Sequence, residues 1–127
     1  MNSDNLQEMD NMRNSLVTIA TEAFRFDNTF WKMLEKLDFE DRKKYLGQYE
    51  WFCKKLKNAL NTAGIDVVDI KGQVYDPGMA VVPLNIDEFD PDNELVIDYL
   101  IEPIIMKDGK TLKEGTALLK LSGGDNA

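Results

Sequence analysis

Apolar side chains in the first third of the chain recur at alternating spacings of three and four residues. This period of 3.5 residues, sustained over four heptads, places them along one face of a long helix. Further apolar residues widen the face beyond the narrow seam of a two-stranded coil, which favours a helical bundle. The row consists of Met9, Met12, Leu16, Ile19, Ala23, Phe26, Phe30, Met33 and Leu37, and the widening residues are Val17, Ala20, Phe24, Trp31 and Leu34.

A second helix is predicted over residues 39–62. Asp38 precedes it as an N-cap, and the acidic Glu40 and Asp41 lie in its first turn, where the helix dipole favours negative charge. Gly64 follows the helix at the position where a left-handed residue is common. The apolar row of this helix is Tyr45, Tyr49, Phe52, Leu56, Ala59 and Ala63.

Two antiparallel helices of this kind, over residues 1–64, cover only one side of each other. The remaining apolar surface predicts self-association, in which two helical hairpins form a dimeric four-helix bundle. The alternative, in which the helices fold back on the rest of the same chain, stays open. The residues expected at the dimer interface are Leu16, Ile19, Ala23, Phe26, Phe30, Met33, Tyr49, Phe52 and Leu56.

After Gly64 the helical period gives way to short apolar runs separated by turn residues. The runs cover residues 65–70, 74–75, 79–86, 94–106 and 116–121. Asp108-Gly109 between two such runs predicts a β-hairpin, and Pro83 and Pro103 are expected at strand ends, edges or bulges. Residues 65–121 are therefore predicted to form a small antiparallel β-domain, with 122–127 as a flexible tail. The predicted fold class is α+β.

Composition and charge narrow the possible functions. The chain has no histidine and a single cysteine, Cys53, so histidine-based nucleophile systems and an intrachain disulfide are impossible. We expect a cytoplasmic, non-enzymatic protein, with Cys53 as a small buried residue. Residues 1–63 carry ten acidic and ten basic side chains, whereas 64–127 carry thirteen and five, so the second half holds the entire net charge of −8. This acidic half argues against nucleic acid and anionic membranes as partners.

No metal or cofactor site is expected. An acidic stretch near the middle of the β half offers the best set of oxygen ligands for calcium, but it lacks the EF-hand spacing and its central glycine. We therefore interpret it as a solvated acidic loop, with cation binding left open. The stretch contains Asp87, Glu88, Asp90, Asp92 and Glu94.

The order of these parts resembles the GrpE family of nucleotide exchange factors, over roughly residues 35–121. Gly64-Ile65 is similar to the family's Gly-Val/Ile near the end of the second helix, and Tyr75-Asp76-Pro77 to its Phe/Leu-Asp-Pro. The segment 106–117 looks like the family's last hairpin, with Lys110 and Lys113 where the family has arginines. The chain would be a divergent, shortened relative without the long N-terminal coiled coil.

The resemblance implies a homodimer whose β-domain binds the nucleotide-binding domain of a DnaK-type chaperone. That contact would favour an open cleft and promote ADP release, without covalent chemistry. The expected partner-binding residues are Lys107, Asp108, Gly109, Lys110, Lys113, Tyr75 and Asp76. The alternative is a dimeric adaptor or scaffold of a phage, secretion or defence system, with no chaperone role.

Overall fold

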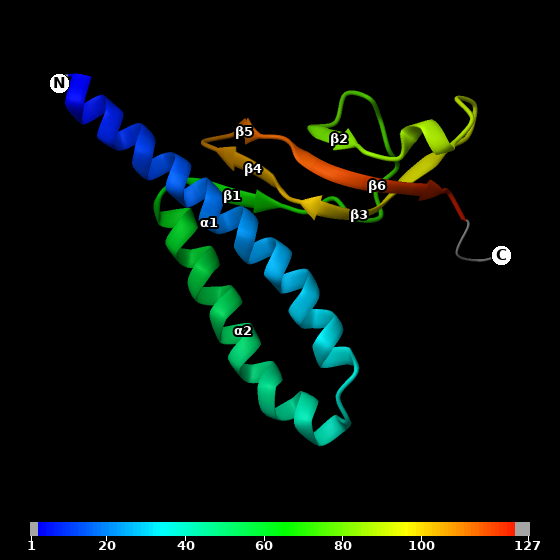
Figure 1. The fold of residues 1–127 in the computed structure, drawn as a ribbon, viewed down its shortest axis with the longest axis horizontal. Coiled ribbons are helices and arrows are strands. Elements are labelled where there is room, and N and C mark those ends of the chain that lie inside the picture. Colours follow the sequence, from blue (N-terminus) through cyan, green and yellow to red (C-terminus); the bar gives the residue numbers. More distant parts are fainter. Residues whose placement is uncertain (1–2, 124–127) are drawn as a thin grey trace. The chain divides into compact units, whose positions relative to one another are not determined.

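The computed structural model describes residues 3–123 and has the predicted α+β class. Two long helices are followed by a small β region whose strand pairs are mostly antiparallel. The chain divides into two compact units, Met1–Ile65 and Asp66–Ala127. Figure 1 shows the helices in blue to green and the strands in green to red.

The two helices are α1 (Ser3–Glu35) and α2 (Phe39–Thr62). Asp38 is the N-cap of α2, as predicted, because its Oδ1 accepts a hydrogen bond of 2.9 Å from the backbone N–H of Asp41. Gly64, at φ 77°, adopts the left-handed conformation expected after α2.

Arg42 closes the connection between the helices. Its Nε donates to the carbonyl of Leu34 at 3.1 Å, and its Nη2 donates to the carbonyls of Glu35 and Leu37 at 3.0 and 3.2 Å. The carbonyls of Leu34 and Glu35 lie in the last turn of α1, where carbonyl groups lack the usual helical donor four residues later, and that of Leu37 lies just beyond the helix. The carbonyl of Leu34 also accepts from the N–H of Leu37 at 3.2 Å. One guanidinium therefore satisfies the open end of α1 from the first turn of α2.

The β region contains two three-stranded sheets, in the orders β1-β4-β5 and β2-β6-β3. The strands are β1 (Ile65–Val68), β2 (Val81–Pro83), β3 (Leu95–Glu102), β4 (Ile104–Lys107), β5 (Lys110–Lys113) and β6 (Gly115–Leu121), and the short 3₁₀ helix η1 (Ile86–Glu88) follows β2. Residues 74–75 form no strand, although Val74 bridges to Val96.

The prediction of a wholly antiparallel β-domain is wrong at one strand pair. β2 pairs with β6 in parallel, with Val81 beside Gly115 and Pro83 beside Ala117. A parallel pair needs a long connection, and here η1, β3, β4 and β5 supply it. Short apolar runs carry no signal for which distant strand they will join.

β3 and β4 form one nearly continuous strand that passes from one sheet to the other at Pro103. β5 and β6 run beside it, so the pair forms a long ribbon shared by both sheets. Gly115 lies at the crossing point, where an added Cβ would meet the carbonyl oxygen of Glu102 at 2.7 Å. Pro103 between two strands and Pro83 at the end of β2 lie at strand ends, as predicted.

The β4–β5 hairpin has the predicted Asp-Gly turn. Asp108 at φ 51° and Gly109 at φ 82° both have positive φ, which is the signature of a two-residue type I′ turn. The core of the β region is made of side chains from β2, β3, β4 and β6, namely Val81, Leu95, Ile97, Leu100, Ile104, Ile105, Ala117 and Leu119.

The predicted tail lies mainly outside the described residues, since 124–127 are not among them. Ser122 continues the backbone pairing beyond β6, because its N–H donates to the carbonyl of Glu94 at 3.0 Å. The ordered ribbon thus extends one residue past the predicted end of the β-domain.

Candidate functional site

An apolar surface runs along the helical unit and contains the predicted dimer interface. Phe26, Phe30, Tyr49 and Phe52 line an apolar hollow of about 150 Å³ together with Asp27 and Gln48. The apolar rows of α1 and α2 therefore meet on one side of the helix pair. Five residues of the predicted dimer interface are half-buried, namely Leu16, Ala23, Phe30, Tyr49 and Leu56. Ile19, Phe26, Met33 and Phe52 are exposed by 52%, 60%, 57% and 48%.

Stacked aromatic rings form the floor of this surface. The ring of Phe30 lies 5.7 Å from that of Phe26 and 5.7 Å from that of Tyr49. The ring centroid of Trp31 lies 5.8 Å from that of Tyr49, and the two rings are tilted relative to each other. Because aromatic rings at such distances attract each other, the floor is organised before any partner arrives.

A polar cluster lies beside the aromatic floor, and the sequence did not reveal it. The thiol of Cys53 donates to Oδ1 of Asp27 over 3.6 Å, which joins α2 to α1. Burial, together with hydrogen bonding to Asp27 and its negative charge, raises the pKa of Tyr49. Burial and the charge of Asp27 also raise the pKa of Cys53. Cys53, half-buried rather than buried, is thus held as a thiol, which is a poor nucleophile.

A heptad pattern is defined by apolar positions alone, so it does not identify Asp27. An acidic residue among Phe24, Phe26 and Phe30 was the available signal. A carboxylate in such a place needs polar partners, and Tyr49 and Cys53 of α2 provide them.

The predicted partner-binding hairpin projects three lysines with different surroundings. Nζ of Lys107 lies 3.5 Å from Oδ2 of Asp108, and Nζ of Lys113 lies 3.5 Å from Oε2 of Glu102. Lys110 is exposed, and no acidic side chain within the described part of the chain pairs with it. Lys110 is therefore the cation of this hairpin most available to a partner.

Tyr75 and Asp76 do not join this hairpin. Figure 1 shows the β4–β5 turn at one end of the β region, away from the loop that precedes β2 and contains both residues. The backbone N–H of Tyr75 donates to the carbonyl of Leu95 at 2.8 Å, and the carbonyl of Asp76 accepts from Met79 at 2.9 Å in a turn. The seven predicted residues thus fall into two separate groups.

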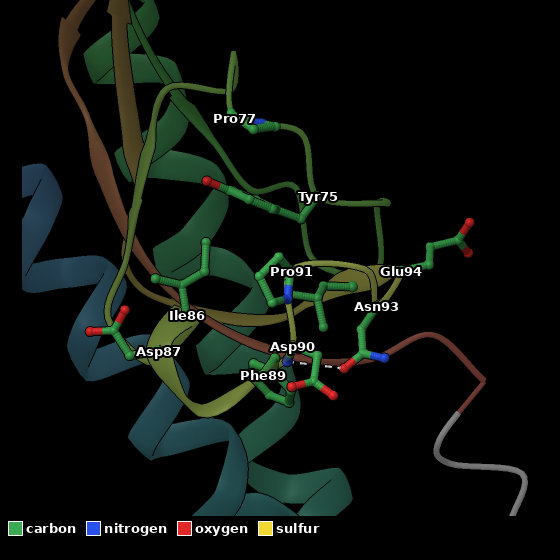
Figure 2. Close-up of a pocket in the computed structure, with 10 residues that line it drawn as sticks. Tyr75, Pro77, Ile86, Asp87, Phe89, Asp90, Pro91, Asn93 and Glu94 are labelled. Carbon is green, nitrogen blue, oxygen red and sulfur yellow. Dashed lines mark hydrogen bonds between the residues drawn. The ribbon is translucent and has the colours of Figure 1, made fainter.

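Tyr75, but not Asp76, lines a pocket of the β region with a volume of about 570 Å³. Figure 2 draws its ten lining residues, which come from the loop before β2 and from the stretch that runs from η1 to the first residue of β3. They include Asp87, Asp90 and Glu94 of the acidic stretch. In residues 3–123 no group of three or more acidic or cysteine side chains is placed to hold a metal ion.

Sequence reasoning treated this acidic stretch as solvated and missed the pocket. The available signal was the interleaving of Phe89 and Pro91 with the carboxylates, since apolar rings are unusual in a purely solvating loop.

Comparisons with models of known protein families, with curated proteins and with solved structures give no match to this chain. Within the described residues, no helix has both the length and the apolar character to cross a bilayer.

Proposed function

We propose that this chain is a GrpE-like co-chaperone, a homodimer that binds a DnaK-type chaperone and promotes ADP release. The observation that carries the proposal is the exposed apolar face on the helical unit, next in sequence to a β region whose β4–β5 hairpin exposes Lys110. The face gives a reason to form a dimer, and the hairpin gives a surface for a second protein.

The dimer interface rests on the aromatic floor and its exposed rim. Phe26 and Phe52 are large apolar side chains that keep about half of their surface in water in one chain. Burying apolar surface stabilises association by roughly 25 cal/mol per Å² before the entropic cost of association is subtracted. A second copy offers the same face about a twofold axis, so each chain would cover the other in a four-helix bundle.

The exchange activity requires only a difference in affinity. A protein that binds the open form of a nucleotide-binding domain more tightly than the closed form shifts the population toward the open form, and nucleotide then leaves faster. The Asp108-Gly109 turn fixes the shape of the hairpin before contact, and Lys110 adds a positive charge that no acidic side chain of residues 3–123 pairs with. Both features suit docking against an acidic surface of the chaperone.

A dimeric adaptor without exchange activity is the second candidate. It is favoured by the pairing of Lys107 and Lys113 with Asp108 and Glu102, which leaves little free positive charge on the hairpin. The two candidates share the dimer and differ in the response of the chaperone.

The deciding experiment measures release of a fluorescent ADP from a DnaK-type chaperone of the same organism, with and without this chain. The co-chaperone proposal predicts a release rate that rises with the concentration of the chain and then saturates. A release rate that does not change, although light scattering gives twice the 14.5 kDa mass of one chain, would leave the adaptor as the function.

A further inference from the structure

The pocket of about 570 Å³ in the β region has a wall of rings and aliphatic side chains. Figure 2 shows the rings of Tyr75 and Pro91 facing the same space. The residues that supply this wall are Tyr75, Pro77, Ile86, Phe89, Pro91 and Leu95. Its volume is within the range of about 300–1,000 Å³ that is usual for ligand sites.

The walls are held by hydrogen bonds of the backbone and of the Asn93 side chain. The N–H of Tyr75 donates to the carbonyl of Leu95 at 2.8 Å, which ties one wall to the start of β3. On the other wall, two hydrogen bonds join Asp90 and Asn93. The backbone N–H of Asp90 donates to Oδ1 of Asn93 at 3.2 Å, and the backbone N–H of Asn93 donates to the carbonyl of Asp90 at 3.1 Å. A pocket formed in advance loses little entropy when it is filled.

The charge around the pocket has one sign. Asp87, Asp90 and Glu94 are the charged residues among the ten that line it, and none of the ten is basic. Figure 2 shows the three carboxylates around the apolar side chains rather than beneath them. The pocket is therefore complementary to an occupant with a positive charge and a flat or apolar body.

We propose that this pocket binds an arginine-containing, extended segment of a partner protein. A guanidinium is planar, stacks on aromatic rings such as Tyr75 and Phe89, and forms paired hydrogen bonds with a carboxylate. A bare metal ion would use only the carboxylates, which do not converge on one point. The site is remote from the β4–β5 hairpin and does not depend on the proposed exchange activity.

The test titrates the purified full chain, without any chaperone, into a short fluorescent peptide of alternating glycine and arginine. The control peptide carries citrulline, which has nearly the same shape as arginine and no charge. Arginine should bind at least about tenfold more tightly than citrulline, and the difference should shrink as salt is raised. In a nitrogen-15 correlation spectrum the arginine peptide should shift the amide signals of Tyr75, Phe89 and Leu95.

Two matched double variants separate the pocket from the net charge of the chain. Asp87→Asn with Glu94→Gln changes lining residues, whereas Glu88→Gln with Asp92→Asn makes the same chemical change in the same segment outside the lining. The first double variant should weaken arginine-peptide binding about five- to tenfold, and the second less than about twofold. All four positions are exposed, so both variants should stay folded.

Equal losses in the two double variants would overturn the proposal, since binding would then follow net charge alone. Equal affinity for the arginine and citrulline peptides would also overturn it, as would the absence of binding. A chaperone that fails to respond in the ADP-release assay leaves this result unaffected, because the peptide assay contains no chaperone.

Discussion

The side chain of Asn85 pairs with the backbone of Leu119 as an additional strand residue would. Its Nδ2 donates to the carbonyl of Leu119 at 2.9 Å, and its Oδ1 accepts from the N–H of the same residue at 2.8 Å. The backbone N–H of Leu84 donates to the carbonyl of Ala117 at 2.9 Å just before it. The segment that leads from β2 into η1 is therefore fastened to β6 through a side-chain amide.

Replacing Asn85 by Ala should remove both hydrogen bonds between this side chain and the backbone of Leu119. The loss leaves two partly buried backbone groups of Leu119 without partners, so the free energy of unfolding should fall by about 1–3 kcal/mol. Urea denaturation measures the change, and faster hydrogen exchange at the Leu119 amide locates it. Asn58→Ala, at an exposed position of α2, serves as the control and should lower stability little if at all. An unchanged Leu119 exchange rate in Asn85→Ala would contradict the prediction.

The crossing point of the two sheets should reject any side chain at Gly115. Its Cβ would lie 2.7 Å from the carbonyl oxygen of Glu102 and 3.1 Å from the carbonyl carbon of Pro103, both of them backbone atoms. Gly115→Ala should therefore destabilise the chain by about 1–3 kcal/mol. Gly47→Ala makes the same change within α2, where the added Cβ would meet no atom within 4 Å apart from the nearby backbone of its own helix. It should stabilise the chain by about 0.5–1 kcal/mol. Thermal melts that shift the same way for both variants would argue against this account.

If the proposed dimer forms through the helical face, replacing Phe26 by a charged residue should disrupt it. This residue and Trp51 are almost equally exposed, by 60% and 62%, but only Phe26 lines the apolar hollow. Phe26→Glu would bury an unpaired carboxylate in each half of a symmetric interface, so the dimer Kd should rise at least about tenfold. Trp51→Glu should change it by less than about threefold. Analytical ultracentrifugation measures both, and equal effects would place the interface elsewhere.

The polar cluster of α1 and α2 should make stability fall at alkaline pH. Because the pKa values of Tyr49 and Cys53 are raised in the folded chain, the folded state holds these protons longer than the unfolded state does. The stability that these two protonated groups give the folded state is fully present at neutral pH. It is lost as the pH rises above roughly 9, where the thiol and then the phenol ionise in the unfolded chain.

Urea midpoints at pH 7 and pH 10 test this direction, with Tyr49→Phe combined with Cys53→Ala as the comparison. The double variant should show a smaller loss of stability between the two pH values than the unaltered chain. A loss of the same size in both would show that other groups, such as the lysines, cause the alkaline effect.

Lys110 should be the hairpin lysine on which chaperone binding depends, if the exchange-factor proposal is correct. Lys110→Glu should weaken binding to the DnaK-type chaperone about three- to tenfold. Lys71→Glu, at another exposed lysine of the acidic half, should weaken it less than about twofold. Calorimetric titration compares them, and equal weakening would show that the hairpin is not the contact.

Much of the fold could be predicted because its signals are local. The 3.5-residue period and the Asp38 cap predicted both helices, and Asp108-Gly109 predicted the hairpin between β4 and β5. These features depend on residues within a few positions of each other, where propensity and capping act directly.

The features that were missed depend on distant partners. The parallel pairing of β2 with β6, the contact of Asp27 with Cys53 and the pocket beside Tyr75 each join residues that are far apart in sequence. A single sequence shows that Asp27 is polar among apolar neighbours, but not which side chain of α2 faces it. The pocket is missed for the same reason, since its two walls come from segments about ten residues apart that meet only after folding.

The ribbon formed by β3–β4 and β5–β6 also restricts how this molecule can change during evolution. A single peptide strand serves both sheets across Pro103, so neither sheet can be deleted or replaced without cutting the other. Extra residues should be accepted at the Asp108-Gly109 tip or in the loop around Gly72, and rejected at Gly115. Insertions and deletions in descendants of this chain should therefore occur at the tips of its loops, while the number of residues between Leu95 and Lys107 stays constant.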